Sequence, residues 1–275
     1  MFYGLTRLPD AGQELRTPNF FRSPGGGAIT TAVAAARLGL RCAVASALSV
    51  DSMRLLRRER IAMRNLGRNG EAPAVTVALS TRADRRFVTF DGVNPRLGPR
   101  IRAAVVRTPA RHVHFALVPR PCRPWLAVVE RLRQRGIGTS WDFGWDDRLA
   151  RDPDLPTIAT SVDYLFLNRD EALLYAGASR LRDALDRWRR LPRHIVIKLG
   201  ADGSRAVGGG SDIVARAMSV RPVDSTGAGD AFNGGFLAAR LRGATLAAAL
   251  ALGNRVGALS TRRPGGIAGL PRRRV

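Results

Sequence analysis

Strand-like apolar runs alternate with helix-like periodic segments along most of this 275-residue chain, and this alternation limits the fold more than any other feature. The expected strands are rich in β-branched and aromatic residues, and they lie at Arg41–Leu48, His112–Leu117, Gly138–Phe143, Tyr164–Leu167 and His194–Leu199. A repeated strand–helix order predicts a mostly parallel sheet with helices on both faces, a three-layer α/β/α fold. Such sheets bind ligands at the carboxyl ends of their strands.

Helical spacing of apolar residues fills the intervals between these strands. The expected helices are Ser52–Leu66, Trp125–Arg135, Asp170–Tyr175, Leu181–Trp188, Ala231–Leu241 and Thr245–Ser260. A periodicity of 3.6 residues is typical of helices that bury one face against a sheet.

One region interrupts the alternation. Val75–Leu79 and Arg86–Phe90 are short β-rich runs joined by Ser80–Asp84, which predicts a hairpin with no helix between its strands. Glu14–Phe21 is interpreted as a further strand beside it. The sequence therefore predicts one domain over residues 1–275, with a small β-lid built from segments at about 9–24 and 72–91.

The composition bears on the class of protein. The formal net charge is +23, and Lys198 is the only lysine among 45 basic residues. Such charge attracts polyanions. The arginines are scattered, however, and no basic tract is interleaved with aromatic residues, which favours an arginine-biased genome over nucleic-acid binding. Only Arg272–Arg274 forms a short run, at the tail.

Other features favour a cytoplasmic protein with no membrane partner. No apolar stretch reaches the roughly 18 residues that span a bilayer, and Met1–Arg7 lacks the pattern of a secretory signal. Cys42 and Cys122 lie far apart and outside any CxxC motif, as expected of reduced thiols.

A glycine-rich turn that opens a helix carries the strongest functional signal. It reads Asp224-Ser225-Thr226-Gly227-Ala228-Gly229-Asp230, and an apolar helical stripe follows. Small residues let the backbone approach a ligand closely, and the free amides and dipole of a helix start bind anions. A carboxylate there can take a proton from a hydroxyl while a phosphoryl group is held still. A plain turn with a helix cap is the structural alternative.

The whole turn resembles the C-terminal signature of the ribokinase-like (PfkB) carbohydrate kinase family. The resemblance implies an ATP-dependent transfer of the γ-phosphoryl group to a hydroxyl of a sugar or nucleoside-like acceptor. Asp230 is then the catalytic base, and the amides of Gly227, Ala228 and Gly229 neutralise the phosphoryl oxygens. In the family, positions matching Asp224 and Thr226 hold a monovalent cation, so activation by K⁺ is a hypothesis.

Further motifs fit the same resemblance. Asn168-Arg-Asp-Glu171 is similar to a family motif whose Glu organises Mg²⁺ and its waters and whose Asn lies near the phosphates, while a helix cap is the local alternative. Mg²⁺ needs only one or two protein carboxylates beside phosphates and waters. Lys198, Gly200 and Gly203 resemble the strand and loop beside the nucleotide, where a strand ending in a turn is the alternative.

Two further segments resemble family positions near the adenine of the nucleotide and near the acceptor sugar. Asn254 matches a family position near the adenine, although a polar helix-surface residue explains it equally well. Gly25, Gly26 and Gly27 enter an alanine-rich helix and resemble the family's first signature, where the glycines approach the acceptor sugar. Thr30 stands where the family commonly has Asn, and one hydroxyl cannot replace both amide functions.

The opening of the chain departs from the family pattern. Members begin with a strand and a glycine-rich turn leading to an Asp that grips the acceptor, and this strand is absent before Met1-Phe-Tyr-Gly-Leu. The expected sheet therefore lacks its first strand, through a misassigned start or a true shortening. Specificity in the family resides in the lid and this strand, so the acceptor cannot be named.

Alternatives remain open at this stage. A catalytically idle relative that binds nucleotide or sugar would explain the missing strand, and a basic nucleic-acid-binding protein would explain the charge. A kinase that acts on an already phosphorylated sugar would also use the arginines.

His112 and His114 share one strand face and have a spacing that suits a metal, but few other ligand residues are near. Asp142 ends a strand near the presumed cleft, where it contacts substrate or caps the strand end. An exposed lid edge invites a homodimer.

Overall fold

The computed structural model describes residues 1–81 and 85–272 of the chain. Part of the turn expected at Ser80–Asp84 and part of the arginine run Arg272–Arg274 therefore lie outside the described residues. Within the described ranges, no helix is both long enough and apolar enough to cross a membrane.

The main sheet has six strands in the order β11-β10-β9-β8-β7-β6. Its strands are β6 (His112–Ala116), β7 (Gly138–Asp142), β8 (Tyr164–Asn168), β9 (His194–Lys198), β10 (Ser204–Gly208) and β11 (Ser211–Ala215). Strands β6 to β9 are parallel, as expected, whereas β10 and β11 add an antiparallel edge that the sequence did not indicate. The carboxyl ends of the four parallel strands therefore share one edge of the sheet.

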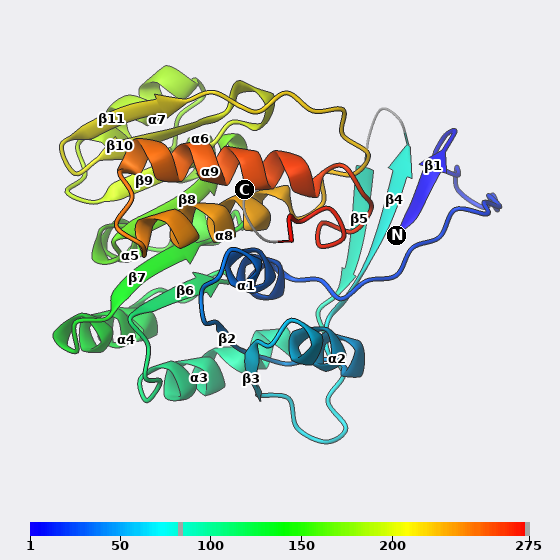
Figure 1. The fold of residues 1–275 in the computed structure, drawn as a ribbon, viewed down its shortest axis with the longest axis horizontal. Helices are drawn as coiled ribbons and strands as arrows, with labels where there is room; N and C mark the ends of the chain where they lie inside the picture. The colour runs from blue at the N-terminus through cyan, green and yellow to red at the C-terminus, as the bar shows by residue number, and fades with distance from the viewer. Residues whose placement is uncertain (82–84, 273–275) are drawn as a thin grey trace.

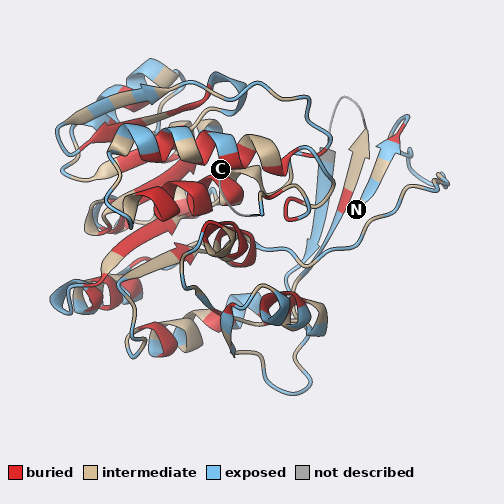
Figure 2. Ribbon diagram, in the orientation of Figure 1, coloured by how far each residue is buried: buried red, intermediate tan, exposed pale blue. Residues whose placement is uncertain are grey.

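Helices cover both faces of this sheet (Figure 1). One face is covered by α3 (Asn94–Val105), α4 (Arg123–Gln134), α5 (Leu155–Ser161), α6 (Arg169–Ala176) and α7 (Leu181–Arg189), and the other by α8 (Ala228–Arg240) and α9 (Leu246–Ser260). Alternate residues of β8 enter the two layers: Leu165 and Leu167 pack into one core and Phe166 into the other. The buried residues of Figure 2 follow these strands and the inner faces of the helices. The three-layer prediction is confirmed.

A smaller unit lies beyond β6. Helix α1 (Gly27–Arg37) packs against α8, and β2 (Ala43–Ser46) pairs in parallel with β3 (Ala62–Asn65) as a separate two-stranded sheet. The single helix expected over Ser52–Leu66 is wrong in its second half. Helix α2 spans Val50–Arg58, and the chain then passes through Arg60 at φ 57°. That left-handed residue ends the helix and sends the chain into β3.

An accessory sheet stands to one side of the body (Figure 1). It has the order β1-β4-β5, with β1 (Phe2–Leu5) parallel to β4 (Val75–Thr81) and β4 antiparallel to β5 (Arg85–Phe90). The hairpin prediction is confirmed. The further strand is β1, however, because within Glu14–Phe21 only Phe20 makes an isolated bridge, to Phe2. The first strand thus belongs to the accessory sheet, and β6 is the edge strand of the main sheet on the side opposite β11.

Candidate active site

The glycine-rich turn enters α8 at the edge of the sheet where the parallel strands end. Gly227 is the N-cap of α8 at φ 73°, a conformation that favours glycine. The amide of Ala231 closes the first helical bond to the Gly227 carbonyl at 2.9 Å, and the Ala228 amide donates to Ser225 at 3.2 Å. The next first-turn amides, those of Gly229 and Asp230, belong to the set that a helix leaves without an internal acceptor. The start of α8 therefore has the amide geometry of an anion site, although the Ala228 amide expected to take part already has an acceptor, and anion binding itself stays a prediction.

Asp230 lies in this first turn and meets the start of α1. A Cβ built on Gly27 would lie 2.9 Å from Oδ1 of Asp230, so only glycine lets the carboxylate lie this close to the loop. The hydroxyl of Thr31 donates to the Asp230 carbonyl at 3.0 Å, which ties the two helices together. Burial and then repulsion by Asp142 raise the pKa of Asp230 to about 7. A carboxylate tuned in this way suits proton transfer at neutral pH.

Lys198, at the end of β9, is held by a carboxylate at the end of β7, two strands away in the sheet. Its Nζ lies 2.5 Å from Oδ2 of Asp142, and the side chains are 13% and 12% exposed. The Nδ2 of Asn233, one turn along α8 from Asp230, donates to the same oxygen at 2.6 Å. Burial lowers the pKa of Lys198, but Asp142 and Glu171 outweigh burial and raise it above its ordinary value. The ammonium is therefore charged.

Asn168 and Glu171 form a complete capping box at the start of α6. Oδ1 of Asn168 accepts the Glu171 amide and Oε2 of Glu171 accepts the Asn168 amide, both at 2.8 Å. The structural alternative for this motif is thus present in the molecule. Burial and then repulsion by Asp142 raise the pKa of Glu171. A nearby cation would offset this electrostatic cost, so Mg²⁺ binding by Glu171 beside its capping role stays a prediction.

The residues expected beside the nucleotide have clear structural partners. Gly200 and Gly203 hold positive φ angles of 63° and 92° in the turn after β9, and a Cβ on Gly203 would clash with the Ala215 carbonyl. The Asn254 side-chain amide donates to the carbonyls of Ala215 and Arg216, each at 3.0 Å. These contacts fasten α9 and the Lys198 loop to the end of β11. An adenine contact by Asn254 stays a prediction.

Asp224 is buried and organises the turn before α8. Its Oδ1 accepts from the amide of Thr226 at 2.9 Å and from the Thr226 hydroxyl at 2.7 Å. Its Oδ2 accepts the amide of Gly265 at 2.7 Å, so the C-terminal segment abuts the turn. Oδ1 of Asp224 and the hydroxyl oxygen of Thr226 thus lie together in the loop that leads into α8.

The glycines expected at the acceptor differ in their surroundings. A Cβ on Gly25 or Gly26 would meet no atom within 4 Å, whereas Gly27 contacts both Asp230 and Ala116 of β6. Thr30 is buried beside the turn: its Cγ2 lies 3.5 Å from the position a Cβ on Gly227 would take. The structure therefore brings Gly27 to the base and Thr30 to the glycine-rich turn, whereas the space around Gly25 and Gly26 is open.

The two histidines of β6 share one hydroxyl. Nε2 of His112 and Nδ1 of His114 lie 2.8 and 2.9 Å from Oγ of Ser140. Burial lowers their pKa values to about 4 and about 3, so both are neutral at pH 7. Among the described residues no group of three or more His, Cys, Asp or Glu side chains is arranged to hold a metal ion.

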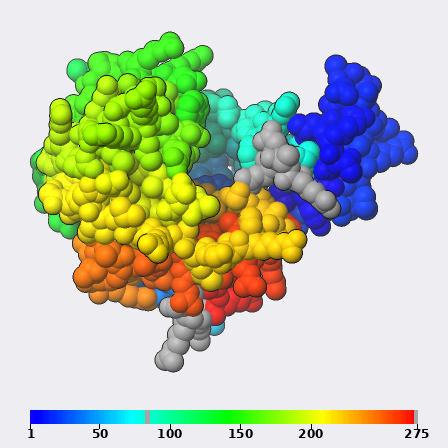
Figure 3. All heavy atoms as spheres, turned by 90° about the horizontal axis from the view of Figure 1, so that it is seen from above, coloured from blue at the N-terminus to red at the C-terminus, as the bar shows by residue number. Residues whose placement is uncertain are grey.

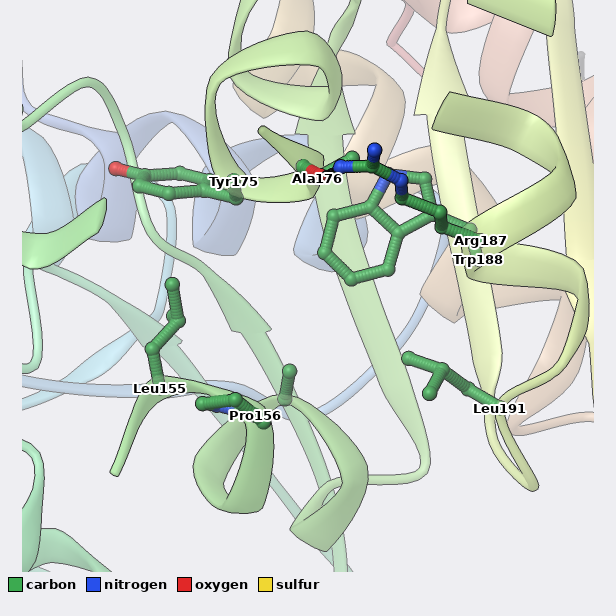
Figure 4. Close-up of a pocket in the computed structure, with 8 residues that line it drawn as sticks. Leu155, Pro156, Tyr175, Ala176, Arg187, Trp188 and Leu191 are labelled. Atoms are coloured by element: carbon green, nitrogen blue, oxygen red, sulfur yellow. Dashed lines mark hydrogen bonds between the residues drawn. The ribbon is translucent and has the colours of Figure 1, made fainter. Parts of the chain in front are cut away.

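Two views locate the open space around the molecule. Seen from above, the surface is hollowed between the body and the accessory sheet (Figure 3). A separate cavity of about 170 Å³ opens between α5, α6 and α7 (Figure 4), with an almost entirely apolar wall. It is lined by Leu155, Pro156, Ala159, Tyr175, Ala176, Arg187, Trp188 and Leu191. Tyr175 belongs to its wall and donates to the Gly144 carbonyl at 2.5 Å, so it braces the loop after Asp142. The cavity lacks carboxylates and does not suit the phosphoryl chemistry.

Sequence reasoning left two residues of this site unassigned. Asn233 and Thr31 follow the quoted motifs closely in sequence, but their partners are 91 and 199 residues away. Only the helical spacing of Asn233, three residues after Asp230, could have pointed to the same side of α8.

A three-layer α/β fold with a carboxylate in the first turn of an anion-binding helix is the arrangement of a small-molecule kinase. Comparison with known families agrees. Residues 2–273 match the model of the pfkB family carbohydrate kinases, and the chain belongs to that family.

Relatives and solved structures extend over most of the chain. An ATP-dependent ribose-1-phosphate kinase from Halopiger xanaduensis is 30% identical over 94% of this chain and 87% of its own length. Probable fructokinase-4 from Arabidopsis thaliana is 25% identical over 92% and 86%. The structure of ribokinase from Giardia lamblia superposes with a TM-score of 0.78 at 20% identity, covering 98% of this chain and 93% of that one. The last match concerns the fold alone.

Proposed function

We propose that this kinase transfers the γ-phosphoryl group of ATP to a hydroxyl of a sugar or nucleoside-like acceptor, with Asp230 as the general base. One observation carries the proposal: the buried carboxylate of Asp230 lies in the first turn of α8, among helix-start amides of the kind that bind phosphate, and burial raises its pKa to about 7. The relatives' names support the acceptor class.

The reaction follows from this geometry. Asp230 accepts the proton of the acceptor hydroxyl, and the oxygen forms a bond to the γ-phosphorus. The bond from that phosphorus to the β–γ bridging oxygen breaks, and ADP leaves with the electron pair. The first-turn amides of α8 hold the equatorial oxygens during the transfer. The proton on Asp230 passes to solvent after product release.

Mg²⁺ fits the residues present. The described residues offer no protein cage, but a buried carboxylate with a raised pKa, Glu171, lies at the edge where the phosphates would bind. Mg²⁺ uses one or two carboxylates together with waters and phosphate oxygens. When bound, it would neutralise negative charge on the phosphates. Glu171 would hold it through water, and Asn168 would lie near the phosphates.

The residues around the base set expectations for the ligands. Gly27 and Thr30 would contact the acceptor, with Gly25 and Gly26 at its approach, and Gly200, Gly203 and Asn254 would border the nucleotide. Closure of the accessory sheet as a lid would exclude water and limit ATP hydrolysis. A cytoplasmic location and the absence of nucleic-acid binding stay predictions.

Potassium activation is part of the proposal. Asp224 and Thr226 gather oxygen atoms behind the anion-binding turn, and a fructokinase structure among the matches is described with a potassium ion. A cation there would strengthen the positive field at the phosphates. The rate in KCl should exceed the rate in choline chloride of equal ionic strength; equal rates would remove K⁺ from the proposal.

The accessory sheet is proposed to pair with a second copy of the chain. Val75 and Val77 of β4 lie opposite Phe90 and Val88 of β5, and all four are exposed, between 40% and 68%. These four side chains form an exposed apolar patch on one face of the hairpin, and β5 is an edge strand. Sedimentation velocity should show a dimer that Val88→Asp dissociates. Thr89→Asp, which points to the opposite face, is the matched control.

The central experiment measures ADP release with ATP, Mg²⁺ and K⁺ against a panel of ribose, ribose 1-phosphate, fructose, adenosine and cytidine. Acceptor-dependent ADP release supports the kinase. Asp230→Asn should bind ATP with near wild-type affinity and lose turnover. A wild-type value of kcat in Asp230→Asn would refute the role of Asp230 as the base. If the unaltered protein binds ATP but shows no turnover with any acceptor, it is a catalytically idle relative.

A further inference from the structure

The single lysine of this chain, Lys198, lies close to the catalytic turn. Of 45 basic residues every one except Lys198 is arginine, and that one lies at the carboxyl end of β9 beside the glycine-rich turn. Its Nζ lies 3.2 Å from the position that a Cβ on Gly229 would take. A compact ammonium fits against this backbone, whereas a planar guanidinium needs more room and a different donor geometry. The Lys198 ammonium therefore lies directly against the backbone of the glycine-rich turn.

The ammonium is held on one side and can bind on another. It has three N–H donors, and among the described residues Asp142 is the acceptor of its hydrogen bond, at 2.5 Å. Asn233 fixes that carboxylate at 2.6 Å from α8, the helix that carries Asp230. The Lys198 ammonium is thus clamped beside the first-turn amides of α8, where a transferred phosphoryl group would lie.

The charges around Asp230 explain why the position of the Lys198 ammonium, held by Asp142 and Asn233, affects the base. The titratable groups that act on Asp230 are Asp142 from β7, Glu171 from α6 and Lys198 from β9. The facing residues of α1 and β6, Gly27 and Ala116, carry no charge. If Lys198 paired with Asp230 directly, it would hold the base as an unreactive carboxylate and lower its pKa. Asp142 instead keeps the lysine as its own partner.

On the basis of the proposed kinase function, we infer that Lys198 is a catalytic cation that contacts the transferring phosphoryl oxygens, and that Asp142 and Asn233 are positioning residues that hold it there and away from Asp230. The ammonium donates to the oxygens on which charge is redistributed during transfer, while the proton from the acceptor goes to Asp230. An ammonium fixed before the reaction stabilises the transition state without reorganisation.

Kinetics of four variants test the inference. Lys198→Met should lower kcat by about 10²-fold or more with a much smaller change in KM for ATP, the loss expected for one preorganised donor. Lys198→Arg should recover less than a tenth of the wild-type kcat. Asp142→Asn should lower kcat and move the acidic limb of the kcat/KM–pH profile to lower pH, because the base loses a repelling neighbour and gains the released lysine. Asp186→Asn, an exposed carboxylate of α7 paired with Arg189, removes the same charge and serves as the control.

A full kcat in Lys198→Arg, or an unmoved acidic limb in Asp142→Asn, would overturn the inference. If wild type shows no turnover with any acceptor, the proposed kinase function fails instead, so the two failures are distinguishable. If the variants do not fold, an experiment on the unaltered protein tests the same inference. An amine-selective acylating reagent at pH 9 can label only Lys198 and the N-terminal amine of this chain.

Labelling is read by peptide mass spectrometry, with the N-terminal amine as the internal standard. A non-hydrolysable ATP analogue should protect Lys198 at least tenfold and leave the N-terminal amine unchanged, and loss of activity should follow Lys198 labelling. Equal labelling of Lys198 with and without the analogue would show that the lysine does not meet the phosphates.

Discussion

Gly27 and Asp230 leave no room for a side chain between them: a Cβ on Gly27 would lie 2.9 Å from Oδ1 of Asp230 and 3.1 Å from Cβ of Ala116. Gly27 starts α1, Ala116 ends β6 and Asp230 lies in the first turn of α8. The geometry of the base therefore depends on three elements that are distant in the sequence.

Gly27→Ala should lower kcat by about 10²-fold, because a displacement of the base by about 1 Å costs that much in a positioned reaction. Folding should be retained, since the strain is local. The measurement is steady-state ADP release together with thermal unfolding. Gly98→Ala in α3 is the matched control, because the added Cβ would lie 3.3 Å from a guanidinium nitrogen of Arg102 and 3.8 Å from the ring of Trp125, without a clash. Equal kcat for both variants would contradict this role of Gly27.

The pH dependence of the reaction should report the ionisation of Asp230. Burial raises its pKa to about 7, and only the deprotonated carboxylate can accept the hydroxyl proton. The value of kcat/KM should therefore fall about tenfold per unit as pH drops below 7 and level off above it. A profile at saturating Mg²⁺ and ATP from pH 5 to 9 tests this. A limb near pH 4 would mean that the base is an ordinary solvated carboxylate.

The parts of the fold that the sequence predicted are those with strong local patterns. The four parallel strands and the β4–β5 hairpin have apolar runs bounded by turn residues, and the structure has them. The strand β3 was missed because Ile61 and Met63 continue the helical spacing of Ser52–Leu66. The break occurs at Arg60, a residue type that gives no turn signal in the sequence although it adopts φ 57°.

The site shows the same division. Asp230 and the glycines of its turn lie within seven consecutive residues, so the motif could be recognised from the sequence alone. The clamp on Lys198 joins β7, β9 and α8, and its members Asp142 and Asn233 are 91 residues apart. Which strand ends face each other depends on the sheet order, and no local pattern encodes that order.

Glu171 combines a cap with an expected role in Mg²⁺ binding, and one substitution separates the two. Glu171→Gln keeps an oxygen that can accept the Asn168 amide, so the capping box and the unfolding temperature should stay close to wild type. The loss of the negative charge should raise the Mg²⁺ concentration for half-maximal rate by about 10- to 100-fold, the range seen when second-shell groups at metal sites are removed.

Asn168→Ala gives the complementary result. It removes the acceptor of the Glu171 amide and should cost about 1 kcal/mol of stability, measured by urea denaturation. For the preceding prediction, an Mg²⁺ dependence that Glu171→Gln leaves unchanged would show that the Glu171 carboxylate serves only as a helix cap.

The crossing of α1 and α8 sets the position of the base and should be intolerant of added volume. A Cβ on Gly234 would lie 2.6 Å from both Cβ of Ala34 and the carbonyl oxygen of Thr31. Because the helices cannot separate without moving Asp230, Gly234→Ala should destabilise the protein by about 1–3 kcal/mol and also lower kcat. Adding Ala34→Gly removes one of the two clashes, so the double variant should recover part of both losses, as a cycle of urea unfolding and ADP-release measurements would show. If Gly234→Ala keeps wild-type stability, the helices tolerate a wider crossing, and the close approach of α1 to α8 does not position the base.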